Sequence, residues 1–310
     1  MTTIDLGAEA VRPTTLLRGS GVAPSHHGEL LQGVFEDGGG LHRGLVTLPC
    51  PVFGSRATIR LAPRPGILAV RPAWKEKARR AAECTLGALG VTAVDGVLEI
   101  ESDVDVGRGL GSSTSDVVAT VHAVLDAVGA QMPPERVAAV AVESETAVDP
   151  LMYDRMVLFA HREADVLEDF HAPVPAMRVL GFAATGGTID TLGLPPARYG
   201  TWEVECFRAL RGLLRRSVRH RDPVGIGRVA TASAMINQRF LPVPGFDRLR
   251  AIARRCGALG VQVAHSGTVV GLLWDEQVPR VTASVAEARR LVEELGIETT
   301  WTFTTEGGWA

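Results

Sequence analysis

The stretch Asp105-Val-Gly-Arg-Gly-Leu-Gly-Ser-Ser-Thr-Ser-Asp116 decides how the chain is interpreted. Its three glycines, Gly107, Gly109 and Gly111, let backbone N–H groups converge without obstruction from Cβ atoms. A helix expected over residues 113–128 turns the positive end of its dipole into this turn. The hydroxyls of the serines and threonine add hydrogen-bond donors or a ligand for Mg²⁺. We therefore expect the stretch to cradle an anion such as a phosphate.

Two common nucleotide-binding patterns do not match this stretch. No Lys precedes the serine pair, as the pattern GxxxxGK[ST] requires, and the third glycine comes one residue too early for GxGxxG. The alternative interpretation is a glycine-rich turn whose serine caps the following helix.

Elsewhere, helical and strand patterns mix without a strict βα repeat. We expect helices at residues 73–89, 113–128, 133–144, 202–218, 225–237, 245–257 and 281–295. We expect strands at residues 96–103, 178–184, 261–264, 269–274 and 298–303, with further β-favouring stretches within 46–61. This mixture favours an α+β fold in two lobes over a doubly wound sheet. The proline-rich segment HAPVPAM, residues 171–177, is the expected boundary between the lobes.

Composition excludes several classes of protein. The 310 residues carry a net charge of −3 and only 5% aromatics, which disfavours a nucleic-acid-binding protein. The four cysteines form no CxxC pair, so we expect reduced thiols and neither a zinc ribbon nor a redox motif. No apolar run approaches the roughly 18 residues of a membrane helix, and the first residues lack a signal-peptide pattern. We expect a soluble, cytoplasmic protein without membrane partners.

An arginine-rich helix is expected over residues 202–218. Its arginines could form a patch for RNA, but an apolar stripe with helical spacing should face a core and leave the arginines in solvent. The stripe consists of Val204, Phe207, Leu210, Leu213 and Leu214.

Three stretches together resemble the GHMP kinases, the family of galactokinase, homoserine kinase and mevalonate kinase. GLGSS at 109–113 resembles the phosphate-binding motif, APSHHGELLQG at 23–33 the first motif, and AHSGTVVG at 264–271 the third. The resemblance implies the two-lobed α+β GHMP kinase fold. Residues 1–172 would form an N-terminal lobe like the second domain of ribosomal protein S5, and residues 173–310 a ferredoxin-like C-terminal lobe.

Within the family, the chain is most similar to the L-threonine kinases of cobalamin synthesis, of the propanediol-utilisation type. Residues 28–33, 107–116, 186–191 and 264–273 carry this similarity. It implies ATP-dependent phosphorylation of the hydroxyl of a small amino acid, best L-threonine, with ATP and Mg²⁺. Another hydroxy amino acid or small alcohol, such as homoserine, remains an alternative, as does a non-catalytic ligand-binding member. A dimer is possible.

The resemblance also assigns site residues. Asp149 would orient or deprotonate the acceptor hydroxyl, while Ser113 and Glu145 would hold Mg²⁺, with Glu143 as the alternative ligand. The expected nucleotide-binding residues are Gly107, Arg108, Gly109, Gly111, Ser112, Ser113, Thr114, Ser266 and Gly267. The expected substrate-binding residues are His27, Gly28, Glu29, Gln32, Asp190 and His265.

Some positions depart from the pattern of that branch. Arg108 replaces its usual Lys, Ala184 stands where an Asp often precedes the glycine pair, and the nearest Glu lies one residue further from Asp149.

Without the resemblance, Glu143, Glu145 and Asp149 would suggest a solvated acidic helix end. A metal site on His26 and His27 is disfavoured, because adjacent residues of a strand point to opposite faces. Instead, we expect one of the two to hydrogen-bond the substrate and the other to be structural. His265 has no acid partner at readable spacing, so a Ser–His hydrolase is not supported.

Overall fold

The computed structural model describes residues 16–91, 95–103, 110–184, 197–265 and 269–305. The strands are β1 (Leu17–Asp37), β2 (Gly40–Ala62), β3 (Leu68–Arg71), β4 (Asp95–Ser102), β5 (Val157–Ala160), β6 (Asp165–Asp169), β7 (Met177–Ala183), β8 (Gly260–Val263), β9 (Val269–Asp275) and β10 (Thr300–Thr304). The helices are α1 (Glu76–Ala88), α2 (Ser112–Val128), α3 (Pro134–Glu145), α4 (Thr201–Arg219), α5 (Pro223–Asn237), α6 (Phe246–Arg255) and α7 (Val281–Glu293). The expected α+β class is confirmed.

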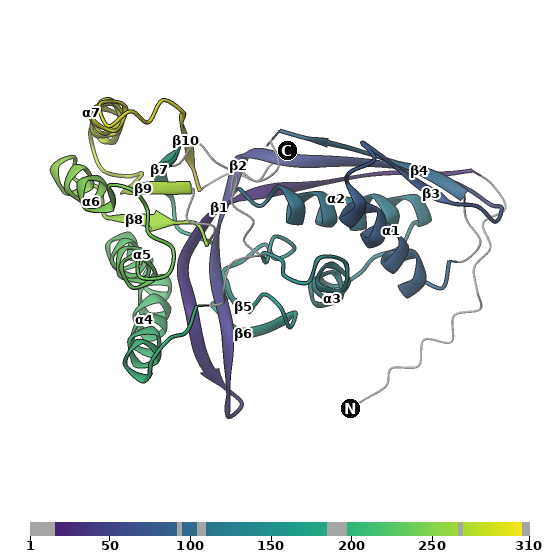
Figure 1. The fold of residues 1–310 in the computed structure, drawn as a ribbon, viewed down its shortest axis with the longest axis horizontal. Helices are drawn as coiled ribbons and strands as arrows, with labels where there is room; N and C mark the ends of the chain where they lie inside the picture. The colour runs from purple at the N-terminus through teal and green to yellow at the C-terminus, as the bar shows by residue number, and fades with distance from the viewer. Residues whose placement is uncertain (1–15, 92–94, 104–109, 185–196, 266–268, 306–310) are drawn as a thin grey trace.

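One sheet runs through the whole molecule. Its strands follow the order β10-β7-β9-β8-β1-β2-β4-β3, and β5 joins the edge of β2 and pairs with β6. β1 and β2 form a long antiparallel ribbon, paired from Leu17 opposite Leu61 to Asp37 opposite Gly40. In Figure 1 this ribbon bends, so that one part lies over α1–α3 and the other passes beside α4 and α5. Of this ribbon, the sequence patterns indicated only stretches within 46–61.

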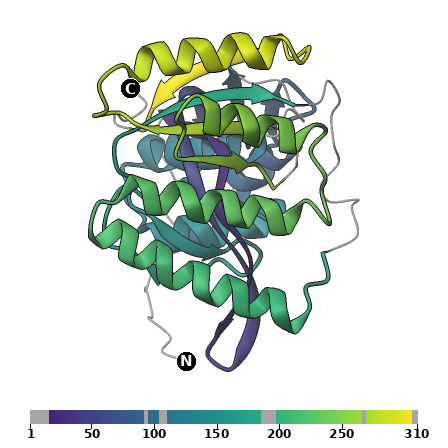
Figure 2. The same ribbon diagram turned by 90° about the vertical axis from the view of Figure 1, so that its left-hand side faces the viewer.

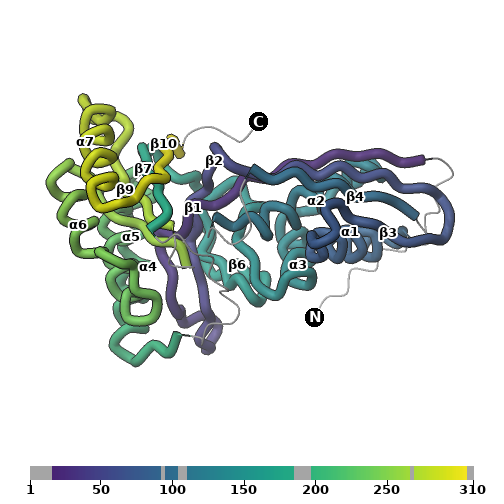
Figure 3. The backbone as a smooth tube through the Cα atoms, turned by 45° about the horizontal axis from the view of Figure 1, so that its top comes forward, coloured from purple at the N-terminus to yellow at the C-terminus, as the bar shows by residue number. Residues whose placement is uncertain are grey.

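In the N-terminal half, strands β1, β2 and β4 form one layer and helices α1–α3 the other (Figure 3). Helix α2 packs directly on β1 because two glycines leave room for it. A Cβ on Gly19 would lie 2.2 Å from the Ala123 carbonyl oxygen, and one on Gly21 would lie 2.2 Å from that of Ala119. This close packing fixes the axis of α2, and therefore where its N-terminus points.

In the C-terminal half, helices α4–α7 cover one face of the sheet (Figure 2). Phe207 and Leu214 of α4 are fully buried, as the apolar stripe predicted, but Leu213 is 38% exposed, so the stripe is narrower than expected. The arginines of α4 were expected to face solvent, but two of them also form ion pairs with another element. Arg211 and Arg215 both bind Glu168 of β6, with Arg211 Nε 2.6 Å from Glu168 Oε2. These ion pairs tie α4 to the N-terminal half.

One core cluster crosses between the halves. It contains Phe35 of β1 and Leu158 of β5 together with Phe207 of α4, Ile226 of α5 and Phe303 of β10. The connection between β6 and β7 contains the boundary expected after residue 172, but the sheet and this core are continuous past it.

Two expectations from composition can be compared with the structure. All four cysteines are free thiols, and Cys50 and Cys256 are buried. Among the described residues, no helix combines the length and the apolar character needed to cross a membrane.

Candidate active site

The site begins at the N-terminus of α2. Gly111 adopts φ of +66° directly before the helix, and a Cβ there would lie only 2.0 Å from His26 Cδ2. The backbone N–H of His26 donates to the Leu110 carbonyl at 3.2 Å. Gly111 therefore brings the start of α2 against the first sequence motif, and its missing Cβ makes room for a histidine ring.

A buried ion pair and two hydroxyls connect the end of β4 to the first turn of α2. Lys75, which precedes α1, binds Asp116 of α2, and both side chains are about 95% buried. The hydroxyls of Ser55 and Ser102 donate to Asp116 Oδ1 at 2.7 and 2.5 Å. Because Ser102 ends the strand before the turn and Asp116 lies in the helix after it, one carboxylate holds both sides. Lys75 balances the charge of the Asp116 carboxylate, and the two hydroxyls provide its remaining hydrogen bonds, so the ion pair can be buried.

The end of α3 brings Glu145 to the start of α2. Glu145 is buried, and its Oε1 accepts from Lys77 Nζ of α1 at 2.8 Å. Its Oε2 lies 3.4 Å from Thr114 Oγ1, and the neighbouring Ser113 acts to lower the pKa of the carboxyl. Burial raises the pKa of Glu145 in spite of the neighbouring Lys77. Glu143, by contrast, is exposed, so of the two candidate metal ligands only Glu145 faces the hydroxyls of α2.

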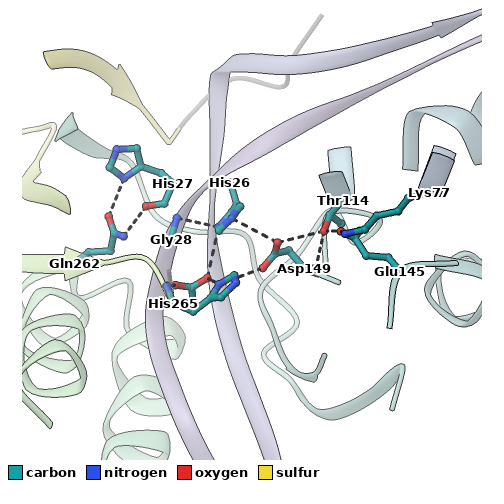
Figure 4. A network of polar contacts seen from close by, with 10 residues as sticks. His26, His27, Gly28, Lys77, Thr114, Glu145, Asp149, Gln262 and His265 are labelled. Atoms are coloured by element: carbon teal, nitrogen blue, oxygen red, sulfur yellow. Dashed lines mark hydrogen bonds and ion pairs between the residues drawn. The ribbon is translucent and has the colours of Figure 1, made fainter. Parts of the chain in front are cut away.

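Asp149 lies just beyond α3, with 4% of its surface exposed. Its Oδ2 lies 3.4 Å from Thr114 Oγ1 and 3.5 Å from His26 Nε2 (Figure 4). Its Oδ1 is buried without a hydrogen-bond partner among the described residues, and lies 4.0 Å from His265 Nδ1. One oxygen of this carboxylate is thus held, while the other is free to accept a proton or a hydrogen bond.

Glu29 holds His265 by two contacts. Glu29 Oε1 lies 2.8 Å from His265 Nδ1, and Glu29 Oε2 accepts the backbone N–H of His265 at 2.5 Å. Burial acts to lower the pKa of His265, but the carboxylates of Glu29 and Asp149 outweigh it and raise the pKa to about 9. His265 is therefore a cation at neutral pH, and its side chain is 38% exposed.

A β-bulge explains why His26 and Glu29 share one side of β1. The register with β2 shifts between these two residues, and Gly28 between them has φ of +95°. His27 points the other way: its Nδ1 lies 2.8 Å from Gln262 Oε1 (Figure 4). Its ring packs on Trp301 and Phe303. Burial lowers the pKa of His27 to about 4. The histidine beside Asp149 is therefore His26, not His27, which was the expected substrate contact.

Some of the other expected site residues lie in the described parts of the chain, and some lie outside them. Ser112, Thr114 and Glu29 are buried in the cluster around α2 and Asp149, while Gln32 donates to the Val263 carbonyl at 3.3 Å, beside β8. The residues that lie outside the described parts of the chain are Gly107, Arg108, Gly109, Asp190, Ser266 and Gly267.

Sequence patterns left the choice between His26 and His27 open and did not indicate Lys77 as a member of this site. Alternation along a strand separates His26 from His27 but cannot say which one faces the site. The glycine at 28 was the available signal, because a bulge there resets the alternation. Lys77 gave no signal, since an exposed lysine near a helix start is ordinary.

The cluster could also be considered as a metal centre. His26, Glu29, Asp149 and His265 offer ligand atoms that all lie within 4.8 Å of one another. However, Gly28 N–H donates to His26 Nδ1 at 3.0 Å, and both oxygens of Glu29 already contact His265. A metal ligand needs a free nitrogen lone pair. The donors and acceptors already match one another, which favours a hydrogen-bonded cluster.

The fold and the site together define a class: an α+β protein that sets a glycine-preceded helix N-terminus beside two buried carboxylates. The family model described as "GHMP kinases N terminal domain" matches residues 76–151, and that described as "GHMP kinases C terminal" matches residues 212–296. The chain belongs to the GHMP kinase family, as its motifs predicted.

Similar proteins include L-threonine kinases. The chain is 29% identical to that of Salmonella typhimurium over 196 residues, and 31% identical to that of Citrobacter freundii over 181 residues. These matches cover 62% and 57% of this chain, and 65% and 62% of the relatives' own lengths.

Solved structures of similar fold include other members of the family. Homoserine kinase from Cytophaga hutchinsonii superimposes with a TM-score of 0.71 at 18% identity, covering 96% of both chains. Mevalonate kinase from methicillin-resistant Staphylococcus aureus gives a TM-score of 0.61 at 14% identity, covering 94% of this chain and 100% of that one. At these identities the likeness concerns the fold.

Proposed function

We propose that this protein transfers a phosphoryl group from ATP to the hydroxyl of a small amino acid, with L-threonine as the acceptor. The observation that carries the proposal is the buried Asp149 carboxylate, whose Oδ1 has no partner among the described residues while its Oδ2 lies beside Thr114 at the start of α2. A proton acceptor thus stands next to the place where a phosphate is expected to bind. The similarity to L-threonine kinases supports the choice of acceptor.

In this mechanism, the phosphates lie at the N-terminus of α2, where the helix dipole and backbone N–H groups attract negative charge. The acceptor hydroxyl donates its hydrogen bond to Asp149 Oδ1. As its oxygen bonds to the γ-phosphorus, the bond from phosphorus to the ADP oxygen breaks and the proton moves to Oδ1. The products are ADP and a phosphate monoester, and Asp149 later returns the proton to solvent.

The residues present suit Mg²⁺. Mg²⁺ prefers hard oxygen ligands, and the Glu145 carboxylate lies at the start of α2, beside Thr114 and near the Ser113 hydroxyl. Glu145 already faces a cation, the ammonium of Lys77. When bound, Mg²⁺ supplies neutralisation of the charge on the transferring phosphate. Ser113 and Glu145 would hold it, and Lys77 would keep the charge of the buried Glu145 balanced in its absence.

For the acceptor, His265 and Glu29 provide opposite charges close to Asp149. The protonated, partly exposed His265 is suited to a carboxylate of the acceptor, because it carries positive charge at neutral pH. Glu29 fixes the orientation of that ring through both contacts. An amino acid with a hydroxyl meets the demands of this site better than a simple alcohol does.

The test is ADP release with Mg²⁺-ATP over a panel of L-threonine, L-serine, L-homoserine and uncharged alcohols, with the product identified by ³¹P NMR. We expect L-threonine to give the highest kcat/KM and O-phosphothreonine as product. Turnover of homoserine or another alcohol with none of threonine would refute the acceptor but keep the kinase. Absence of ADP above buffer with every acceptor would favour a non-catalytic ligand-binding protein.

A further inference from the structure

The ring of His26 is held on several sides in the centre of the site. Only 1% of His26 is exposed. Its ring stacks on that of His265, with centroids 5.6 Å apart and planes inclined by 13°. On another side it fills the space that a Cβ of Gly111 would take. This buried imidazole has no role in the mechanism above, although it lies against Gly111 before α2 and beside Asp149 (Figure 4).

Hydrogen bonding decides where the proton of His26 lies. The backbone N–H of Gly28 donates to Nδ1 at 3.0 Å. A backbone N–H can only donate, so Nδ1 carries a lone pair and the proton of the neutral ring is on Nε2. Nε2 lies 3.5 Å from Asp149 Oδ2. The bulge at Gly28 therefore selects the tautomer that points an N–H at the carboxylate.

We propose that His26 is a positioning residue for Asp149. Its Nε2–H and the Thr114 hydroxyl both face Oδ2, and this leaves Oδ1 as the oxygen that meets the acceptor. The proposal rests on the proposed function, since it assigns His26 a part in the same reaction. His26 does not itself serve as the base, because one ring nitrogen is protonated and the other is occupied by Gly28.

His26 also joins two parts of the site that must act together. Its backbone N–H binds the Leu110 carbonyl and its ring contacts Gly111, so the strand carrying it is tied to the start of α2. A shift of α2 would therefore move the ring that holds Asp149. This coupling keeps a constant distance between the phosphate end and the acceptor end of the site, and misplacement by about 1 Å can cost about 10²-fold in rate.

The first test compares His26→Leu with His26→Gln. Leu removes the N–H, whereas Gln can donate an amide N–H toward Asp149 and accept from Gly28 with its oxygen. We expect His26→Leu to lower kcat by about 10²-fold with the KM for ATP little changed, and His26→Gln to recover most of kcat. His122→Leu is the control, since Nδ1 of this half-buried histidine of α2 faces the Val22 carbonyl oxygen at 3.1 Å, and kcat should stay at the wild-type value.

A double-mutant cycle separates positioning from a general structural role. If His26 acts through Asp149, then His26→Leu costs little further activity once Asp149 is Asn. The same loss in both backgrounds would overturn the proposal, and so would an unchanged kcat of His26→Leu in an active wild-type enzyme.

The tautomer can be measured without turnover. ¹⁵N NMR of histidine-labelled protein should report His26 as neutral and protonated on Nε2. A proton on Nδ1 would overturn the proposal whatever the activity of the protein. Because this readout needs no substrate, its failure is distinguishable from failure of the kinase assignment, which would appear as a wild-type protein that turns over no acceptor.

Discussion

At the scale of single residues, position 111 needs glycine for two separate reasons. Its φ of +66° is a conformation that L side chains rarely adopt, and a Cβ would enter the ring of His26. Gly129, at the other end of α2, has nearly the same φ of +68° but open space where a Cβ would go. A substitution of Gly129 therefore measures backbone strain alone, whereas a substitution of Gly111 adds steric contact to that strain.

We predict that Gly129→Ala lowers the free energy of unfolding by about 1–2 kcal/mol, the cost of the left-handed conformation. Gly111→Ala should cost about 1–3 kcal/mol more, because the added methyl overpacks a buried ring. It should also reduce kcat. Chemical denaturation of the two variants measures the difference. Equal losses would mean that His26 moves aside freely.

A second residue-scale prediction concerns Glu143 and Glu145, near the end of α3. Glu145→Gln removes the buried carboxylate that faces Ser113, so we expect the Mg²⁺ concentration for half-maximal rate to rise by about tenfold or more, the equivalent of about 1.4 kcal/mol or more of lost binding. Glu143→Gln is the matched control, exposed and two residues earlier. Titration of activity with Mg²⁺ compares them. A similar response of both variants would place the metal ligand elsewhere.

These residues show what sequence patterns can and cannot predict of a site. Ser113 and Asp149 were predicted from motif and resemblance, and both lie in the described cluster at the start of α2 and the end of α3. The choice between Glu143 and Glu145, and between His26 and His27, depends on how α3 ends and on the bulge at Gly28. Those are tertiary features, and neighbouring residues of the same type give no local signal to distinguish them.

At the scale of secondary-structure elements, α4 is held to the N-terminal half by charge as well as by packing. Glu168 of β6 binds both Arg211 and Arg215, and its side chain is only 11% exposed. Burial acts to raise the pKa of Glu168, but the two guanidinium groups outweigh it and hold the pKa below its ordinary value. The ion pairs of Glu168 therefore stabilise the fold at pH values above the ordinary pKa of a glutamate. This stabilisation is lost as the pH falls through the lowered pKa of Glu168.

We predict that Glu168→Gln lowers the free energy of unfolding by about 1–3 kcal/mol at neutral pH, between the values for surface and buried pairs. The difference from wild type should shrink in acid, as Glu168 becomes protonated. Asp247→Asn, which removes the 92% exposed partner of Arg250, should change stability by less than about 0.5 kcal/mol. Urea denaturation at neutral and acidic pH is the measurement. A pH-independent difference would contradict the ion-pair explanation.

Most elements could be predicted from sequence; the exceptions are the long ribbon β1–β2 and the strands β3, β5 and β6, of only four or five residues each. The helices α1–α7 and the strands β4 and β7–β10 follow hydrophobic periodicity within a few residues. The ribbon β1–β2 did not, because a long, bent strand pair buries different faces along its length, which interrupts the alternation on which strand recognition depends. Its bulges at Gly28 and before Ser25 interrupt the alternation further.

At the scale of the whole molecule, the two expected lobes share a sheet and a core. β1 pairs with β8 at Glu29 opposite Val263, and Phe35 of β1 contacts Phe207 of α4 with ring centroids 5.9 Å apart. Neither half can be removed without exposing apolar surface of the other. This continuity also places Glu29 and His265, from the two halves, in one hydrogen-bonded contact.

We therefore predict a single cooperative unfolding transition. Far- and near-ultraviolet circular dichroism should give the same midpoint in denaturant, and residues 1–172 alone should not show a cooperative transition. Two separated transitions, or a fragment that folds independently, would show that the division after residue 172 is a true boundary between autonomous domains.

The central claim, that Asp149 accepts the proton of the acceptor hydroxyl during phosphoryl transfer, is tested most directly by the kcat of Asp149→Asn on the acceptor that the wild-type enzyme uses best. Asn keeps the size and polarity of Asp149 but cannot accept a proton. Because general-base help is typically worth about 10²–10⁴-fold, we expect kcat to fall by that factor, with ATP binding and folding retained. A kcat close to that of the wild type would contradict the claim and leave catalysis to positioning and Mg²⁺ alone.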